Sequence, residues 1–279
     1  MKQDFTYKSQ DGHHIEISAY GVDHFGERPC LLYLHGFKGF KDWGFVPFAG
    51  EYFVKAGFSF IAFNFSHNGI GADPLAFTEL EKFEKNTYLR ELKETEELIH
   101  LCVHTDFFGM YLKHKLGLIG HSRGGGVALL SGNNSPDVSA VCTWASISTV
   151  ERFTKQQRET WRKQGYWEVV NSRTKQVFRL GLDMLNEIER FGKSKLNILK
   201  AVQDLDRPLL MLHGQEDESV PFFEAEQLNI YADPARARLR LIPNAGHTFG
   251  AKHPFEASGK ALDEVLDLSA DFFRNHLIQ

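Results

Sequence analysis

The chain has 279 residues, of which 42% are hydrophobic and 24% charged, and its net charge is −4 at pH 7. This balance predicts a soluble chain with a sizeable core, and the absence of a basic block argues against nucleic acid as a partner. The three scattered cysteines indicate neither a zinc site nor a disulfide framework, and without a secretory signal or a membrane-length apolar run we expect a cytoplasmic protein with no membrane partner.

Short apolar runs predict the strands of a sheet. The run "HHIEISAY" at 13–20 alternates in period two, which is typical of a half-exposed edge strand. The later runs are nearly continuous in apolar residues, as expected of buried strands, and lie at 29–36, 58–65, 115–120, 139–146, 207–214 and 237–243. Buried strands separated by helical segments favour an α/β fold with a mostly parallel sheet covered on both faces.

Helical periodicity fills the segments between these strands. Residues 44–56, 86–104 and 259–277 each place apolar side chains on one face and polar side chains opposite. Residues 150–203 are the exception, because they read as helices with no strand between them where a regular unit needs only a short crossover. We therefore expect a single α/β domain over residues 1–279, with a small helical lid insertion at about 150–203.

The turn after the strand at 115–120 carries Gly120-His121-Ser122-Arg123-Gly124, a G-x-S-x-G pattern between a strand and a helix. A serine at the apex of such a sharp turn is strained, and side chains two positions before and after it would collide, which explains Gly120 and Gly124. The helix that follows turns its free N–H groups and its positive dipole end toward the serine. We interpret Ser122 as a nucleophile; the alternative is a generic glycine-rich turn.

A serine hydroxyl is a weak nucleophile until a base takes its proton and an acid orients that base. His247 is the candidate base, because it follows the last predicted strand and a glycine that lets the chain turn. Three acids compete after the strand at 207–214, namely Glu216, Asp217 and Glu218. A chain order of serine, acid and histidine is that of the fold class in which this serine turn occurs.

The backbone N–H groups of Phe37 and Arg123 are the candidate oxyanion hole. Phe37 follows His35-Gly36 at the end of the strand at 29–36, and Arg123 follows the serine directly. One such donor is typically worth about 10²–10³ in rate. A single glycine followed by phenylalanine also places an aromatic ring beside the expected acyl pocket.

The candidates for contact with substrate are aromatic side chains and one histidine: Phe37, His121, Trp144 and, in the insertion, Trp161, Tyr166 and Trp167. His121 neighbours the nucleophile and would either touch substrate or only pack. A core role is equally plausible for Trp144, and the tryptophans of the insertion could simply pack it on the sheet. None of these residues identifies the substrate.

These elements, in this order, resemble the α/β-hydrolase superfamily from about residue 13 to the C-terminus. The motifs "HGFKGFKDWGF", "GHSRGG" and "HGxxDxxVP" make the chain similar to the branch of dienelactone hydrolases and cinnamoyl or feruloyl esterases. The resemblance implies an eight-stranded sheet and a serine hydrolase that needs no metal or organic cofactor. It also selects Asp217 as the acid, because the family pattern places the acid at that spacing.

The chain departs from the family pattern after the fourth strand. Many relatives carry an Asp-x-Arg-Gly-x-Gly turn there, whereas this chain has "NFSHNGIG" at 64–71. We therefore expect a pocket of different shape.

The expected activity is that of a carboxylesterase that acts on a small or medium acyl ester through an acyl-enzyme. A thioesterase or a small-peptide hydrolase would use the same three residues; a peptidase of this fold often carries a propeller or a larger N-terminal region, for which this chain has no room. A protein that kept the fold for binding alone is a further alternative. Nothing in the sequence indicates an oligomeric state.

A metal site at His100 and His104 is the last alternative. These two histidines lie four residues apart on a predicted helix, with Cys102 between them. Residues at that spacing share a helix face, but Cys102 points elsewhere and no further ligands cluster nearby. We expect exposed histidines at the end of a helix.

Overall fold

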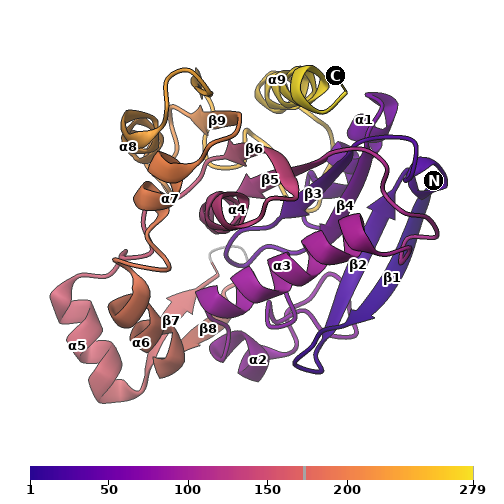
Figure 1. The fold of residues 1–279 in the computed structure, drawn as a ribbon. Helices are drawn as coiled ribbons and strands as arrows, with labels where there is room; N and C mark the ends of the chain where they lie inside the picture. The colour runs from indigo at the N-terminus through magenta and orange to yellow at the C-terminus, as the bar shows by residue number, and fades with distance from the viewer. Residues whose placement is uncertain (172–173, 279) are drawn as a thin grey trace.

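The computed structural model describes residues 1–171 and 174–278 (Figure 1). The strands are β1 (Lys2–Lys8), β2 (His14–Tyr20), β3 (Cys30–Leu34), β4 (Ser59–Phe63), β5 (Leu116–His121), β6 (Val138–Trp144), β7 (Tyr166–Val170), β8 (Val177–Gly181), β9 (Leu209–Gly214) and β10 (Ala237–Ile242). The helices are η1 (Val22–His24), α1 (Val46–Lys55), α2 (Leu80–Glu84), α3 (Tyr88–His104), α4 (Arg123–Asn134), α5 (Lys155–Gln164), α6 (Leu182–Phe191), α7 (Ile198–Asp204), α8 (Phe223–Tyr231) and α9 (Lys260–Leu277).

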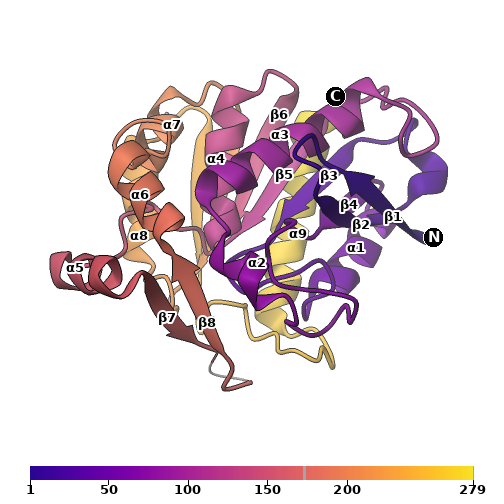
Figure 2. The ribbon, with the colours of Figure 1, turned by 90° about the horizontal axis from the view of Figure 1, so that it is seen from below.

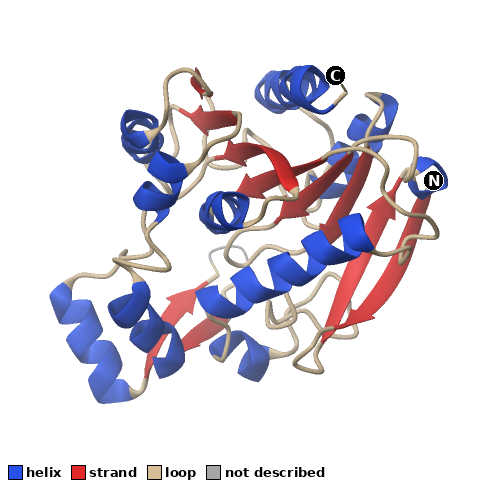
Figure 3. Cartoon of the chain, in the orientation of Figure 1, coloured by secondary structure: helices blue, strands red, loops and turns tan. Residues whose placement is uncertain are grey.

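Within the described residues, eight strands form one sheet in the order β1-β2-β4-β3-β5-β6-β9-β10 (Figure 3). The pairs β1–β2 and β2–β4 are antiparallel, and every later pair is parallel. The eight-stranded, mostly parallel sheet is therefore confirmed. β1 was not among the predicted strands, because its sequence "KQDFTYK" is largely exposed and carries little apolar signal. The parallel strands end along one edge, where loops can bring distant residues together.

Helices cover both faces of the sheet, with α1 and α9 on one face and α3 and α4 on the other (Figures 1 and 2). Successive residues of a strand point to opposite faces. Leu32 and Leu118 accordingly pack under α3 and α4, whereas Leu31 and Ile119 pack under α1 and α9. Each fully buried aliphatic or aromatic side chain contributes roughly 1.5–3 kcal/mol to folding, so the two apolar layers hold the strand ends in place.

The expected all-helical insertion at 150–203 is wrong, because β7 and β8 form an antiparallel hairpin between α5 and α6. α5 begins with a capping box between Thr154 and Gln157, and it ends at Gly165, whose φ is +85°. The residues after Gly165, "YWEVV" and later "VFRLG", are rich in aromatic and β-branched side chains, which suit strands. Residues 172 and 173 of this segment lie outside the described part of the chain.

The hairpin and its two flanking helices lie beyond the sheet, and β8 of the hairpin lies next to α2 (Figures 1 and 2). Phe178 on β8 packs on Phe77 and Phe83, with ring centroids 5.0 and 4.5 Å away. Gln176 Nε2 donates a hydrogen bond to the backbone oxygen of Phe77 over 2.9 Å. Residues 77–84, which lie between β4 and α3, therefore support the hairpin. None of the described helices combines the length and the apolar character that a transmembrane span requires.

Candidate active site

Ser122 stands at the turn between β5 and α4 in a backbone conformation that is unusual for a residue with a side chain. Its φ is 57° and its ψ is −120°. The turn is held because the N–H of Ser122 donates to the oxygen of Trp144 over 2.8 Å, and the N–H of Ile147 donates to the oxygen of Ser122 over 3.2 Å. Such strain persists only where the surroundings fix it, and it is frequent at functional sites.

The glycines on each side of Ser122 are required by close backbone contacts. A Cβ on Gly120 would lie 2.2 Å from the oxygen of Gly124, and a Cβ on Gly124 would lie 2.3 Å from the oxygen of Leu34. Gly125 is equally constrained, because its Cβ would meet the Ser146 side chain at 2.5 Å. The turn can therefore fit between β3 and β6 only with these three glycines.

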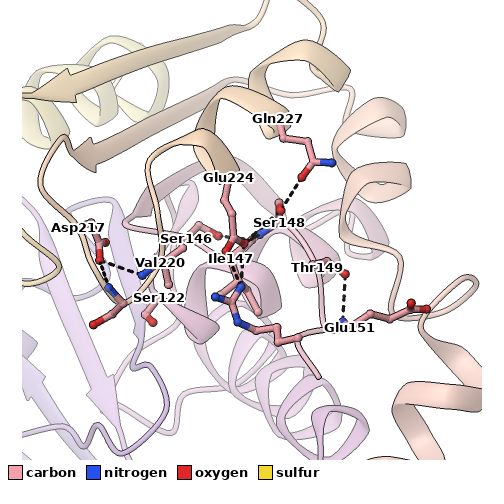
Figure 4. A network of polar contacts seen from close by, with 12 residues as sticks. Ser122, Ser146, Ile147, Ser148, Thr149, Glu151, Asp217, Val220, Glu224 and Gln227 are labelled. Atoms are coloured by element: carbon pink, nitrogen blue, oxygen red, sulfur yellow. Dashed lines mark hydrogen bonds and ion pairs between the residues drawn. The ribbon is translucent and has the colours of Figure 1, made fainter. Parts of the chain in front are cut away.

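The structure brings Ser122, His247 and Asp217 into one hydrogen-bonded row. Ser122 Oγ lies 2.9 Å from His247 Nε2, and His247 Nδ1 lies 2.7 Å from Asp217 Oδ2. Because Nδ1 faces a carboxylate, it carries the proton, which leaves Nε2 free to accept from the serine. Asp217 Oδ1 accepts from the N–H groups of Ser219 and Val220, both over 2.9 Å, as Figure 4 shows for Val220.

Of the three competing acids, only Asp217 reaches His247. Asp217 is buried, whereas Glu216 and Glu218 are exposed. Burial alone would raise the pKa of Asp217, but hydrogen bonds from His213 and His247 and the charge of His247 outweigh it and hold this pKa well below its ordinary value. Asp217 therefore stays ionised at neutral pH and can orient His247.

The loop after β3 lies directly against the serine. A Cβ on Gly36 would lie 2.8 Å from the Cβ of Ser122, so the loop can approach this closely only because residue 36 is glycine. Within the described chain, the backbone N–H groups of Phe37 and Arg123 have no hydrogen-bond acceptor. Two free donors therefore lie on the segments on either side of Ser122, which is the arrangement that a candidate oxyanion site requires.

His35 holds this loop in place, a role that was not predicted from the sequence. The N–H of Phe65 donates to His35 Nε2 over 3.3 Å, so Nδ1 carries the proton and donates to the oxygen of Gly36 over 2.9 Å. Burial lowers the pKa of His35 to about 4, which keeps the ring neutral. The sequence pattern that could have revealed this role of His35 is the "LHG" at the end of a buried apolar run.

His121 and Trp144, two candidates for contact with substrate, have different positions. His121 borders the smaller of two cavities at the serine, and its Nε2 donates to the oxygen of His247 over 2.9 Å. Trp144 is fully buried on the opposite face of the sheet, where its Nε1 donates to Ser269 Oγ over 3.0 Å. The expectation that Trp144 contacts substrate is therefore wrong, because the alternation of β6 turns its side chain toward α9.

Among the described residues, two cavities border Ser122. One has a volume of about 260 Å³ and lies between His121, Phe40 and Trp43. The other has a volume of about 450 Å³ and lies under the insertion, which contributes Trp167, Val169, Leu180, Met184 and Ile188 to its wall. Four residues border both cavities, namely Phe37, Lys38, Ser122 and His247.

Trp161 and Tyr166, the other two aromatic residues singled out in the insertion, pack within it. Trp161 is fully buried and meets Phe153 edge to face at 4.9 Å between centroids. The guanidinium of Arg179 lies over the ring of Tyr166 at 4.1 Å. Of the three aromatic residues singled out in this segment, Trp167 alone is part of the cavity wall.

The side chain of Arg123, which had no predicted role, is buried below the larger cavity. Its Nε donates to Glu91 Oε2 over 2.9 Å, and its guanidinium stacks on Tyr88 at 4.0 Å from the ring centroid. Asn86 Nδ2 donates to the second oxygen of Glu91 over 2.8 Å. This buried pair connects the first residue of α4 to α3, next to Ser122.

The structure places no metal-binding cluster at the candidate histidines. His104 Nε2 lies 2.8 Å from Asp137 Oδ2, and the rings of His100 and His104 lie 5.2 Å apart. Cys102 is buried in the core. Across residues 1–171 and 174–278, no group of three or more His, Cys, Asp or Glu side chains is arranged to hold a metal ion.

The fold is shared with solved structures of low sequence identity. A putative hydrolase from Agrobacterium vitis is 18% identical, covers 98% of both chains and has a TM-score of 0.73. Est1E from Butyrivibrio proteoclasticus with bound ferulic acid is 17% identical, with 97% of this chain and 98% of that chain covered and a TM-score of 0.71. A dienelactone hydrolase from Anabaena variabilis is 16% identical, with 99% of both chains covered and a TM-score of 0.63.

Sequence comparison identifies the family. No curated protein matches the chain. The prolyl oligopeptidase family, in contrast, matches residues 93–277, a stretch that includes Ser122, Asp217 and His247. This match spans more than half of the chain, and the chain therefore belongs to the prolyl oligopeptidase family of α/β hydrolases.

Proposed function

We propose that this protein is a serine hydrolase that cleaves carboxylic esters with a small or medium acyl group. The contact that carries the proposal is that of Ser122 Oγ with His247 Nε2 at 2.9 Å, in line with the 2.7 Å contact between His247 Nδ1 and Asp217. A strained serine, an aligned base and a buried acid together form the arrangement that activates a hydroxyl for acyl transfer.

In the first half of the proposed reaction, His247 Nε2 takes the proton of Ser122 Oγ while Oγ bonds to the ester carbonyl carbon. The carbonyl π electrons move to oxygen, and the N–H groups of Phe37 and Arg123 stabilise this oxyanion. When the tetrahedral species collapses, the bond to the alcohol oxygen breaks. That oxygen leaves with the proton from His247, and the acyl group stays on Ser122.

In the second half, water takes the place of the alcohol and the steps run in the reverse order. His247 takes a proton from water, the resulting hydroxide attacks the acyl carbon, and Ser122 Oγ leaves with the proton from His247. Asp217 keeps its charge throughout and stabilises the imidazolium that forms in both halves. The free acid is then released, and the enzyme returns to its starting state.

The two cavities support a substrate that extends on both sides of its carbonyl. Residues 150–203 provide much of the wall of the larger cavity, and we infer that they are a lid on a single domain of 279 residues. Structural neighbours named as an esterase domain, as Est1E with ferulic acid and as a dienelactone hydrolase favour an ester as the substrate.

Peptide hydrolysis is the second candidate, and the match to the prolyl oligopeptidase family favours it. The same serine attacks an amide, but the poorer leaving group needs its nitrogen protonated by His247. A thioester would need less assistance from His247 for its leaving group. It completes the set of acyl substrates to be compared.

The test combines an active-site label with a substrate panel. A fluorophosphonate probe should label the wild type and not the Ser122→Ala variant, whose fold is checked by circular dichroism. The panel contains p-nitrophenyl esters of increasing chain length, methyl ferulate, an acyl-CoA and a prolyl p-nitroanilide. The highest kcat/KM is expected for an ester. Equal labelling of the two proteins would refute the mechanism, and a preference for the anilide would make the protein a peptidase.

A further inference from the structure

The larger cavity at Ser122 has an apolar wall but a strongly basic set of charged residues. The wall is apolar and aromatic, through residues such as Trp167, Leu180 and Met184. Among the described residues that line it, Lys38, Arg123 and Arg152 carry the charges, and no Asp or Glu is present. A cavity that combines apolar walls with a few convergent polar groups is suited to orient a small ligand.

Arg123 brings an incompletely satisfied guanidinium to this cavity. The residue is only 6% exposed, and its Nε is paired with Glu91. Nη2 has only the sulfur of Met184 as an acceptor, at 3.8 Å, and Nη1 has no acceptor in the described part of the chain. No Arg123 nitrogen is both fully buried and without a partner among the described residues, so the free donors of Nη1 are open to the cavity, where a ligand can accept from them.

Arg152 is held at the same cavity by a buried carboxylate. Its Nη1 donates to both oxygens of Glu224, over 2.7 and 2.8 Å. Glu224 is in turn fixed by the backbone N–H of Ser148 over 2.8 Å and by Ser148 Oγ over 3.2 Å, within the network of Figure 4. Since Glu224 does not line the cavity, it positions the guanidinium without occupying the space of a ligand.

Lys38 completes the set at the boundary of the two cavities. Its only hydrogen-bond partner among the described residues is the backbone oxygen of Val170 at 3.4 Å, and no carboxylate there lies within ion-pair distance. The chain holds it there through a left-handed backbone conformation, with φ at +58°. This ammonium group therefore faces the cavity without a counter-charge of its own.

We propose that the larger cavity binds the carboxylate of a substrate whose remaining part is apolar. This inference rests on the proposed function, because it names the substrate class of the same site: an ester that carries a second, ionised carboxyl group. Guanidinium groups bind carboxylates through paired, charge-assisted hydrogen bonds, and such contacts are stronger than neutral ones. The apolar wall accommodates the alkyl or aryl portion between the carboxylate and the scissile bond.

A binding measurement tests the proposal without requiring turnover. The Ser122→Ala variant is titrated calorimetrically with 4-phenylbutyrate, with its neutral amide 4-phenylbutyramide and with 3-phenylpropyl phosphate. The three probes share one apolar body and differ in the head group. We expect the carboxylate to bind about 10-fold more tightly than the amide, in line with the strength of charge-assisted hydrogen bonds.

Variants in the same background locate the effect. Arg152→Gln and Lys38→Met should each reduce the carboxylate-to-amide preference by several-fold, and together they should reduce it further, with Arg123 left as the remaining guanidinium. The matched control is Arg158→Gln, which removes an arginine of α5 that does not line the cavity and should preserve the preference. Equal binding of carboxylate and amide, or a preference that the double substitution leaves unchanged, would overturn the proposal. Tighter binding of the phosphate than of the carboxylate would also overturn it.

Turnover separates this inference from the proposed function. Active enzyme is assayed with the p-nitrophenyl monoester of adipic acid and with p-nitrophenyl hexanoate, which have acyl chains of equal length. The ratio of their kcat/KM values should favour the monoester and fall in Arg152→Gln. Hydrolysis of both esters with no preference would overturn the carboxylate site and leave the serine mechanism standing. Without any hydrolysis, the calorimetric result alone decides the carboxylate site.

Discussion

His121 is hydrogen-bonded to the backbone of His247: its Nε2 donates to the carbonyl oxygen over 2.9 Å, and the two rings lie 4.8 Å apart. The residue before the serine thus fixes the loop that carries the proposed base. Burial and the neighbouring His247 lower the pKa of His121 to about 3, so the ring stays neutral while it donates. We therefore predict that His121 acts as a positioning residue.

The first prediction concerns this contact. His121→Phe keeps a ring of similar size but removes the donor, so we expect kcat to fall about 10-fold, as is common when a buried hydrogen-bond partner is lost. His121→Gln keeps a donor and should recover part of the rate. Steady-state kcat and KM, with the rate of fluorophosphonate labelling, measure the effect. A role in substrate binding alone would instead raise KM in both variants and leave labelling unchanged.

A second prediction distinguishes Asp217 from its neighbours. Asp217→Asn should lower kcat by about 10⁴, because an amide no longer selects the His247 tautomer that accepts from Ser122. Glu216→Gln and Glu218→Gln remove exposed carboxylates one residue away and are the matched controls, with less than a twofold effect expected. Ester hydrolysis of the three variants checks this. Comparable losses in all three would argue for a general charge effect at this loop.

The third prediction concerns the packing of the serine turn. Gly120→Ala would place a methyl group 2.2 Å from the oxygen of Gly124, so the turn must shift or open. Since overpacking a core costs typically about 1–3 kcal/mol, and backbone atoms yield less than side chains, we expect a loss of about 3 kcal/mol or more in the free energy of unfolding. Urea denaturation measures it. Gly259→Ser, where a Cβ meets nothing within 4 Å, is the control and should be close to neutral.

The fourth prediction concerns stability and pH. Glu94 is buried on α3, where its Oε2 accepts from the N–H of Ser66 over 2.9 Å, and burial raises its pKa to about 7. Between the unfolded pKa of about 4.5 and this value, the folded protein binds the extra proton. The contribution of Glu94 to the free energy of unfolding is therefore complete below pH 4.5, declines as the pH rises and is lost above pH 7. It amounts to at most about 3 kcal/mol.

Unfolding of the wild type, Glu94→Gln and Glu96→Gln by urea at pH 4.5, 6 and 8 measures this contribution. Relative to the wild type, Glu94→Gln should gain stability steadily as the pH rises. Glu96 is exposed on the same helix, so its substitution should show no such trend. A stability difference between wild type and Glu94→Gln that is independent of pH would show that Glu94 is ionised in the folded protein.

The candidate site was largely predictable because its residues stand at the ends of recognisable strands. Three of these ends also carry a histidine: His35, His121 and His213. Each donates to a backbone oxygen of a loop at the site, in Gly36, His247 and Val220 respectively. An apolar run followed by histidine was visible in the sequence, but the acceptor of His121 lies 126 residues away, on a loop that only the folded sheet brings within reach.

The insertion was less predictable, because its strands are short and its tertiary support lies elsewhere in the chain. Val169 and Leu180 face the cavity while Val170 and Val177 are exposed, so the alternation of the hairpin is only partly apolar. A few residues of each strand then give too weak a period-two signal beside the strong helical periodicity of the flanking segments. For Trp144 the strand was predictable, but the face of the sheet to which its side chain points was not, because that face follows from the packing of the sheet.

The ring contacts of Phe83 have a consequence for how specificity can diversify in such proteins. Phe83 lies 5.4 Å from Phe37 on the loop after β3 and 4.5 Å from Phe178 on the hairpin, so one side chain supports both the insertion and the loop beside Ser122. A chimera that takes only residues 150–203 from a relative would lack the matching residues 77–84 on which the hairpin packs. A working chimera should need residues 77–84 from the same relative. The segments that determine specificity are therefore separate in the sequence but must change together.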